Sequence, residues 1–147
     1  MISSKMLVRI SAALIVVHLL GHTIGHLTWD EPEDPKMGAV VKVMKSYSAD
    51  FMGASKTMAE YYNGYSIMIF GLFIMTILLL WSISGFVTEQ KDIANKLLLP
   101  IGVIYILFGV VEFVYFFPFA AGISLCSGLC TTLAVFVNKK VPYPFPE

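Results

Sequence analysis

Four long apolar runs constrain the fold of this 147-residue chain more than any other feature. They cover about residues 6–27, 65–87, 97–117 and 119–138. A helix rises about 1.5 Å per residue, so each run can cross roughly 30 Å of hydrocarbon. The 57% hydrophobic and 14% charged content also departs from that of soluble domains. The sequence therefore predicts an all-α fold, a four-transmembrane-helix bundle that forms a single integral membrane domain over residues 1–147.

The first apolar run has a second interpretation, because Lys5 and Arg9 precede it as basic residues precede the core of a signal peptide. A signal peptide would carry a small-x-small cleavage site after its core. The chain has Gly-His-Thr-Ile-Gly-His there instead. We therefore expect this segment to be retained as the first membrane helix.

The basic residues predict the orientation. Lys5 and Arg9 begin the chain, two lysines lie between the second and third runs, and two more follow the fourth. Four spans place all three sites on one side, which the positive-inside rule assigns to the cytoplasm. Both termini are then cytoplasmic and residues 28–64 lie outside. That outer segment carries four lysines of its own, together with six carboxylates.

Within the outer segment, apolar side chains recur near helical spacing between Lys36 and Met58, with lysines between them. This pattern predicts an amphipathic helix that lies on the membrane or caps the bundle. The apolar positions are Val40, Val43, Met44, Tyr47, Phe51 and Met58. Farther along, Pro100 is expected in the first turn of the third span, where a missing N–H costs little. The proline-rich tail over residues 141–147 is expected to be extended.

Two rows of small residues predict where the helices approach closely. They are Ala13, Val17, Gly21 and Gly25 in the first span, and Gly122, Cys126, Cys130 and Ala134 in the fourth. The two cysteines are then interpreted as packing residues. A redox or metal role for them is the less favoured alternative.

The first span also carries every histidine of the chain, His18, His22 and His26, at intervals of four residues. Over this stretch the helix face turns by about 80° and rises by about 12 Å. One metal ion can bind two of these imidazoles but not all three from an unbroken helix. Histidines on one helix cannot be opposite axial ligands of a haem, and no other histidine exists, so the sequence disfavours haem.

Glu112, in the third span, is the other residue that points to a functional site, because an ionisable group inside a membrane helix is costly. Counting residues from the helix ends places Glu112 and His22 at nearly the same depth. We therefore predict a polar, outward-facing pocket inside the membrane that contains both. The residues predicted to bind a ligand are His18, His22, His26, Glu112, Tyr65 and Tyr105; those predicted at the pocket mouth are His26, Glu60, Asp30 and Asp50.

A structural role is the alternative explanation for this pocket. A buried hydrogen bond between histidine and glutamate can join two membrane helices, at about 1 kcal/mol. For a single histidine this explanation is the simpler one. Three histidines on one stripe, level with the one carboxylate in the spans, leave the two explanations evenly matched.

Several short motifs resemble an uncharacterised family of small bacterial four-helix integral membrane proteins. They are Gly-His-Thr-Ile-Gly at residues 21–25, Leu-Thr-Trp at 27–29, Ala-Asp-Phe-Met-Gly at 49–53 and Tyr-Tyr-Asn-Gly-Tyr-Ser at 61–66. The resemblance covers most of the chain and includes His22, Trp29, Asp50, Gly53 and Gly64. His18 and His26 do not map onto it. It implies the bundle fold and the bacterial inner membrane, and no activity.

Four functions fit the predicted pocket. The first is binding of a small amphipathic ligand such as a lipid or quinone. The second is binding of a divalent metal such as zinc by His18 and His22, or by His22 and His26, with Glu112 or Asp30 completing the shell; His22, His26 and Asp30 are the favoured set. The third is an enzyme that uses a His/Glu acid–base pair on a lipid-soluble substrate. The fourth is a structural or accessory subunit of a larger membrane complex, or a homo-oligomer. No nucleophile, phosphate-loop or Cys/His metal motif supports catalysis, and no basic patch points to nucleic acid.

Overall fold

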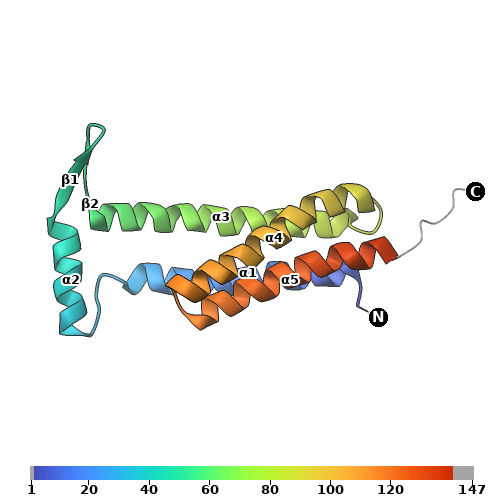
Figure 1. Ribbon diagram of the computed structural model, residues 1–147, viewed down its shortest axis with the longest axis horizontal. Coiled ribbons are helices and arrows are strands. Elements are labelled where there is room, and N and C mark those ends of the chain that lie inside the picture. The colour runs from blue at the N-terminus through green and yellow to red at the C-terminus, as the bar shows by residue number, and fades with distance from the viewer. Residues whose placement is uncertain (1, 141–147) are drawn as a thin grey trace, which may run out of the picture. The chain divides into compact units, whose positions relative to one another are not determined.

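The computed structural model describes residues 2–140, so the predicted extended tail lies outside the described residues. The elements, in chain order, are α1 (Ser4–Thr28), α2 (Pro35–Ser46), β1 (Ser48–Phe51), β2 (Ala54–Thr57), α3 (Met58–Phe86), α4 (Lys91–Tyr115) and α5 (Pro118–Lys140) (Figure 1). Helices α1, α3, α4 and α5 are each long and apolar enough to cross a membrane. The predicted set of four candidate spans is therefore confirmed.

The chain divides into two compact units. Unit 1 comprises Met1–His18 and Phe73–Glu147, and unit 2 comprises Leu19–Leu72. Helices α1 and α3 each contribute residues to both units, whereas α4 and α5 belong to unit 1 and α2 with the two strands to unit 2. The prediction that the whole chain is one domain stays a prediction.

The amphipathic helix expected between Lys36 and Met58 is wrong in its second half. Helix α2 begins at Pro35, where the Asp34 side chain accepts a hydrogen bond from the backbone N–H of Lys36, and it ends at Ser46. Pro35 suits this first position because its missing N–H would have no partner in the helix. Tyr47 is extended, with φ −94° and ψ 120°, so the helical spacing stops there.

The two strands after α2 form an antiparallel hairpin, in which Phe51 pairs with Ala54 and Ser48 with Thr57 (Figure 1). Its two-residue loop has positive φ at both positions, 50° at Met52 and 85° at Gly53. Such a loop matches the twist of the flanking strands, and glycine adopts it without strain. The conformation of these two loop residues therefore accounts for the hairpin turn.

Helix α3 begins at Met58, seven residues before the start predicted for the second span. Thr57 and Glu60 form a capping box. The Thr57 hydroxyl accepts a hydrogen bond from the backbone N–H of Glu60 at 3.1 Å, and the Glu60 carboxylate accepts one from the N–H of Thr57 at 2.8 Å. Because this exchange satisfies two N–H groups at the helix start, it fixes where α3 begins.

Helix α4 also begins early, at Lys91, and this overturns the prediction for Pro100. Pro100 lies in the interior of α4 rather than in its first turn. There it leaves a carbonyl of the preceding turn without its N–H donor. The second and third spans are therefore longer than their apolar cores, because polar first turns extend them.

Helices α4 and α5 pack directly against each other (Figure 1). A Cβ added at Gly128 would lie 2.6 Å from the backbone nitrogen of Ile106, and one added at Gly109 would lie 2.9 Å from the backbone nitrogen of Leu125. Only glycine allows such an approach, which is the packing that membrane helices favour. At the predicted small residues Gly21, Gly25 and Gly122, an added Cβ would meet no atom of the described chain within 4 Å.

A row of buried polar side chains joins α1 to α5 within unit 1. Ser4 donates to Asn138, and Ser11 lies 2.7 Å from both the Ser127 and the Thr131 hydroxyls. Ser4, Ser11 and His18 are spaced seven residues apart, so they share one face of α1. These hydrogen bonds set the rotation of α1 against α5 and turn His18 toward the interior of unit 1.

Candidate functional site

The Glu112 carboxylate lies near the end of α4, inside unit 1. Its Oε1 atom is 3.6 Å from Nε2 of His18, and the side chains are only 16% and 11% exposed. At this distance the two groups attract each other electrostatically without a normal hydrogen bond. The partner that the structure gives to Glu112 is therefore His18. His22 belongs to unit 2, and its predicted pairing with Glu112 stays a prediction.

The other ring nitrogen of His18 is held from α5. The Ser124 hydroxyl lies 3.2 Å from Nδ1 of His18 and is also within hydrogen-bonding reach of the Glu112 carboxylate. The His18 ring stacks at a tilt on Phe73, with ring centroids 4.6 Å apart. Ser124 is fully buried and Phe73 nearly so. Helices α1, α3, α4 and α5 thus each contribute one side chain to this cluster, which we call the Glu112 cluster.

Two buried polar atoms of α4 have no hydrogen-bond partner among residues 2–140. They are Oε2 of Glu112 and the hydroxyl of Tyr105, which lies two turns earlier on the same helix. Thr76 lies close to the Tyr105 hydroxyl, without a hydrogen bond of normal geometry. Buried polar atoms in native proteins nearly always have a partner, which is often water or a ligand. The Glu112 cluster therefore offers one unmatched acceptor, and Tyr105 offers an unmatched hydroxyl two turns away on α4.

The other two histidines belong to unit 2, where they form a cluster around Ser66 of α3. Nε2 of His22 lies 3.1 Å from the Ser66 carbonyl oxygen, and Nδ1 of His26 lies 2.8 Å from the Ser66 hydroxyl. Phe70 packs edge-on against both imidazole rings, with centroids at 4.7 Å and 5.3 Å. We call this group the Ser66 cluster.

In the Ser66 cluster, Nε2 of His22 lies 3.1 Å from both the carbonyl oxygen and the hydroxyl of Ser66. In the tautomer that carries a proton on Nε2, His22 donates to the carbonyl, and the Ser66 hydroxyl can then donate to Nδ1 of His26. Both contacts then join a donor to an acceptor. The Ser66 cluster is therefore a satisfied link between α1 and α3.

The predicted metal ligands His22, His26 and Asp30 do not form a three-ligand site. Among the described residues, no group of three His, Cys, Asp or Glu side chains is arranged to hold a metal ion. Asp30 instead pairs with Lys45 at 2.9 Å. The hydrogen bond from Lys45 holds the pKa of the Asp30 carboxyl below its usual range. Asp30 is thus a surface ion-pair residue.

Tyr65 and Glu60, predicted in and beside the pocket, line an open depression of about 390 Å³ in unit 2. Tyr65 is 65% exposed there, and Glu60 is held by its capping hydrogen bonds and by Lys56 at 3.0 Å. Asp50 lies on the exposed strand β1. No histidine and no Glu112 atom lines this depression. Within unit 2, no described hydrogen bond or ion pair joins these three residues to His22 or His26.

Sequence reasoning missed the two serines that hold the histidines. Ser124 and Ser66 lie in apolar spans, where single serines are common and carry no motif. The seven-residue spacing of Ser4, Ser11 and His18 was the available signal for the α1–α5 contact.

Comparison with known proteins returns nothing similar: no family model, no curated protein and no solved structure matches the chain. The resemblance to a bacterial membrane family stays a prediction. Any functional assignment must therefore come from the chemistry of the clusters themselves.

Proposed function

We propose that this chain is a multi-pass membrane protein that binds the polar end of a small amphipathic ligand, such as a quinone or a lipid, at the Glu112 cluster. The observation that carries the proposal is the buried Oε2 atom of Glu112, which has no hydrogen-bond donor within residues 2–140. A carboxylate inside a membrane helix is costly and is usually retained for function. A ligand hydroxyl would supply the missing donor.

The second unmatched group, the Tyr105 hydroxyl, narrows the chemistry of the ligand. Tyr105 lies about 10 Å along α4 from Glu112, and its hydroxyl can donate a hydrogen bond to a carbonyl oxygen of the ligand. A ligand with an acceptor at one point of its head group and a hydroxyl at another would complement both. Quinones in their oxidised and reduced forms, and lipids with hydroxyl and ester groups, have this combination.

The surroundings of Glu112 favour a ligand that arrives from the lipid phase. Its neighbours Val111 and Phe113 are 48% and 69% exposed. In a membrane span, exposed apolar side chains face acyl chains. A water-soluble ligand would have to cross that layer, whereas an amphipathic one partitions into it. The predicted location, a bacterial inner membrane with both termini in the cytoplasm, belongs to this proposal and is supported by the positions of the lysines.

The test is binding of a short-chain ubiquinone analogue to the purified full-length protein in a mild detergent. We expect saturable binding by the wild type and at least tenfold weaker binding by Glu112→Leu. Leucine removes the buried oxygen that lacks a donor within residues 2–140, and it also removes the carboxylate beside His18. The His18 ring keeps its contacts with Ser124 and Phe73, so this variant should stay folded, and its unfolding midpoint is measured beside its binding. Glu89→Gln removes an exposed carboxylate outside the spans and is the matched control.

Two results would contradict the proposal. One is equal binding of the quinone analogue by the wild type and Glu112→Leu, together with no lipid or quinone in extracts of the purified protein. The other is a stoichiometric divalent metal in the wild type that is lost in Glu112→Gln. That second result would make the Glu112 cluster a metal site and favour the metal-binding alternative.

A further inference from the structure

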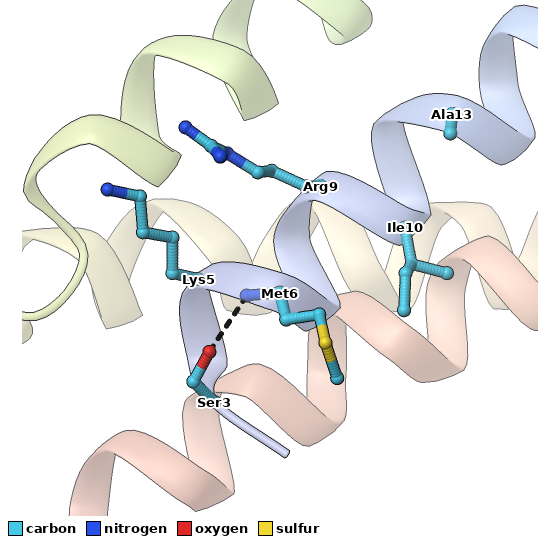
Figure 2. Close-up of a pocket in the computed structure, with 6 residues that line it drawn as sticks. All are labelled: Ser3, Lys5, Met6, Arg9, Ile10 and Ala13. Atoms are coloured by element: carbon cyan, nitrogen blue, oxygen red, sulfur yellow. Dashed lines mark hydrogen bonds between the residues drawn. The ribbon is translucent and has the colours of Figure 1, made fainter.

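The first two turns of α1 carry a basic surface that the Glu112 cluster does not use. An open depression of about 380 Å³ is lined by Ser3, Lys5, Met6, Arg9, Ile10 and Ala13 (Figure 2). Lys5 and Arg9 extend to one side of the helix, whereas Met6 and Ile10 lie along the other (Figure 2). The depression thus has a basic side and an apolar side.

The Arg9 side chain is held in place from α3. Its guanidinium carbon lies 5.1 Å from the centre of the Trp81 ring, and its Nε donates to the Ser84 hydroxyl at 3.5 Å. These contacts use the face and one edge of the guanidinium. The two terminal amino groups have no hydrogen-bond partner within residues 2–140, and they form the planar fork that binds phosphate with two parallel hydrogen bonds.

No carboxylate of residues 2–140 pairs with this surface. Within the described part of the chain, neither Lys5 nor Arg9 forms an ion pair, although both lie in a helix that can cross a membrane. Charged groups in membrane helices are normally paired with an opposite charge. The positive end of the α1 dipole lies in the same first turn and adds to the demand for an anion.

We infer that this depression binds an anionic phospholipid, with its phosphate against Lys5 and Arg9 and an acyl chain along Met6, Ile10 and Ala13. The apolar positions follow one another along the helix for almost two turns, and Met6 and Ile10 are 43% and 40% exposed. A free phosphate would use only the basic side. A phospholipid uses both sides, and basic surfaces beside membrane helices are where anionic head groups bind.

The test uses native mass spectrometry of the full chain, purified in detergent. It measures how much phosphatidylglycerol and how much phosphatidylcholine, with identical acyl chains, the protein binds. The wild type should prefer phosphatidylglycerol. The double variant Lys5→Gln/Arg9→Gln should bind phosphatidylglycerol about fivefold more weakly for each charge removed, whereas its binding of phosphatidylcholine should not change. Lys36→Gln/Lys42→Gln removes two exposed charges of α2 and is the matched control. Arg9→Lys keeps the charge and should retain most of the preference.

Three results would overturn the inference. They are an unchanged preference in Lys5→Gln/Arg9→Gln, an equal loss in Lys36→Gln/Lys42→Gln, and full displacement of phosphatidylglycerol by millimolar inorganic phosphate. The last would show a free-phosphate site instead of a lipid site. If the double variant fails to fold, Lys5→Gln alone gives the same readings, because it removes one exposed charge without a described partner.

Discussion

The Glu112 cluster and the Ser66 cluster both contain histidines of α1, yet they differ in what remains unmatched. In the Ser66 cluster, His22 and His26 share one serine whose carbonyl and hydroxyl complement both rings. In the Glu112 cluster, a serine holds one nitrogen of His18, and the carboxylate beside the other nitrogen keeps a buried oxygen that has no donor among residues 2–140. The unmatched carboxylate oxygen is what distinguishes a candidate binding site from a structural link.

The two units also differ in how closely their helices pack at glycine. The largest loss of stability that we expect from a substitution follows from this difference. In unit 1, a Cβ at Gly128 would lie 2.6 Å from a backbone nitrogen of α4, which cannot move aside as a side chain can. Gly128→Ala should lower the free energy of unfolding by about 1–3 kcal/mol through overpacking. The measurement is the thermal unfolding midpoint in detergent, followed by circular dichroism.

Gly21→Ala in unit 2 is the matched control, because an added Cβ there meets nothing within 4 Å in the described chain. Alanine is also the better helix former, so this variant should unfold at the wild-type temperature or slightly above it. An equal fall of the unfolding midpoint in Gly21→Ala and Gly128→Ala would show that Gly21 also lies in a tight helix contact. The units would then not differ in how closely their helices pack at these glycines.

Ser66→Ala tests whether the Ser66 cluster is structural. The change removes the hydroxyl that lies 2.8 Å from Nδ1 of His26 and leaves that nitrogen without this partner. An unmatched, partly buried polar atom costs about 1–3 kcal/mol, so the unfolding midpoint should fall by less than in Gly128→Ala or at most equally. Ser82→Ala, at an exposed position of the same helix, should leave it unchanged.

Binding of the quinone analogue gives the second reading of Ser66→Ala. A structural link predicts that the folded fraction of this variant binds as tightly as the wild type. Loss of binding with an unchanged unfolding midpoint would contradict that assignment. It would place His22 and His26 in the binding site, as the sequence predicted.

The sequence was sufficient for the spans because length and apolar content alone determine which segments can cross a bilayer. It also contained the capping box at Thr57 and Glu60, a short motif that a closer reading would have found. The hairpin was harder, because its strands are only four residues long and almost wholly exposed, and only Gly53 marks the turn. Helical spacing in the surrounding residues was therefore misleading.

The partner of Glu112 could not be predicted from the sequence for a different reason. Residue counting gives the depth of a side chain in the membrane but not the rotation of its helix. In this protein the rotation of α1 depends on hydroxyl contacts with α5, such as those of Ser11 with Ser127 and Thr131. These residues are more than a hundred positions apart in the chain. Only the packed helices show that His18 faces Glu112.

The smallest expected effect concerns the charged surface of unit 2, where Asp30 and Glu60 each pair with an exposed lysine, whereas Glu112 lies beside a histidine in the interior of unit 1. The Lys45 hydrogen bond holds the pKa of Asp30 below its usual range, so the folded carboxyl gives up its proton more readily than the unfolded one. The stabilisation is then fully present above the unfolded pKa and is lost as the pH falls through the folded pKa. The pair is exposed and screened by solvent, so the unfolding midpoint of Lys45→Gln should barely differ from that of the wild type.

The measurement is an NMR titration of the Asp30 side-chain carboxyl. Lys45→Gln should raise the pKa of Asp30 toward 3.8, its ordinary value, whereas Lys42→Gln should not. Equal pKa values in the wild type and Lys45→Gln would show that Asp30 is not paired and return it to the set of available ligands.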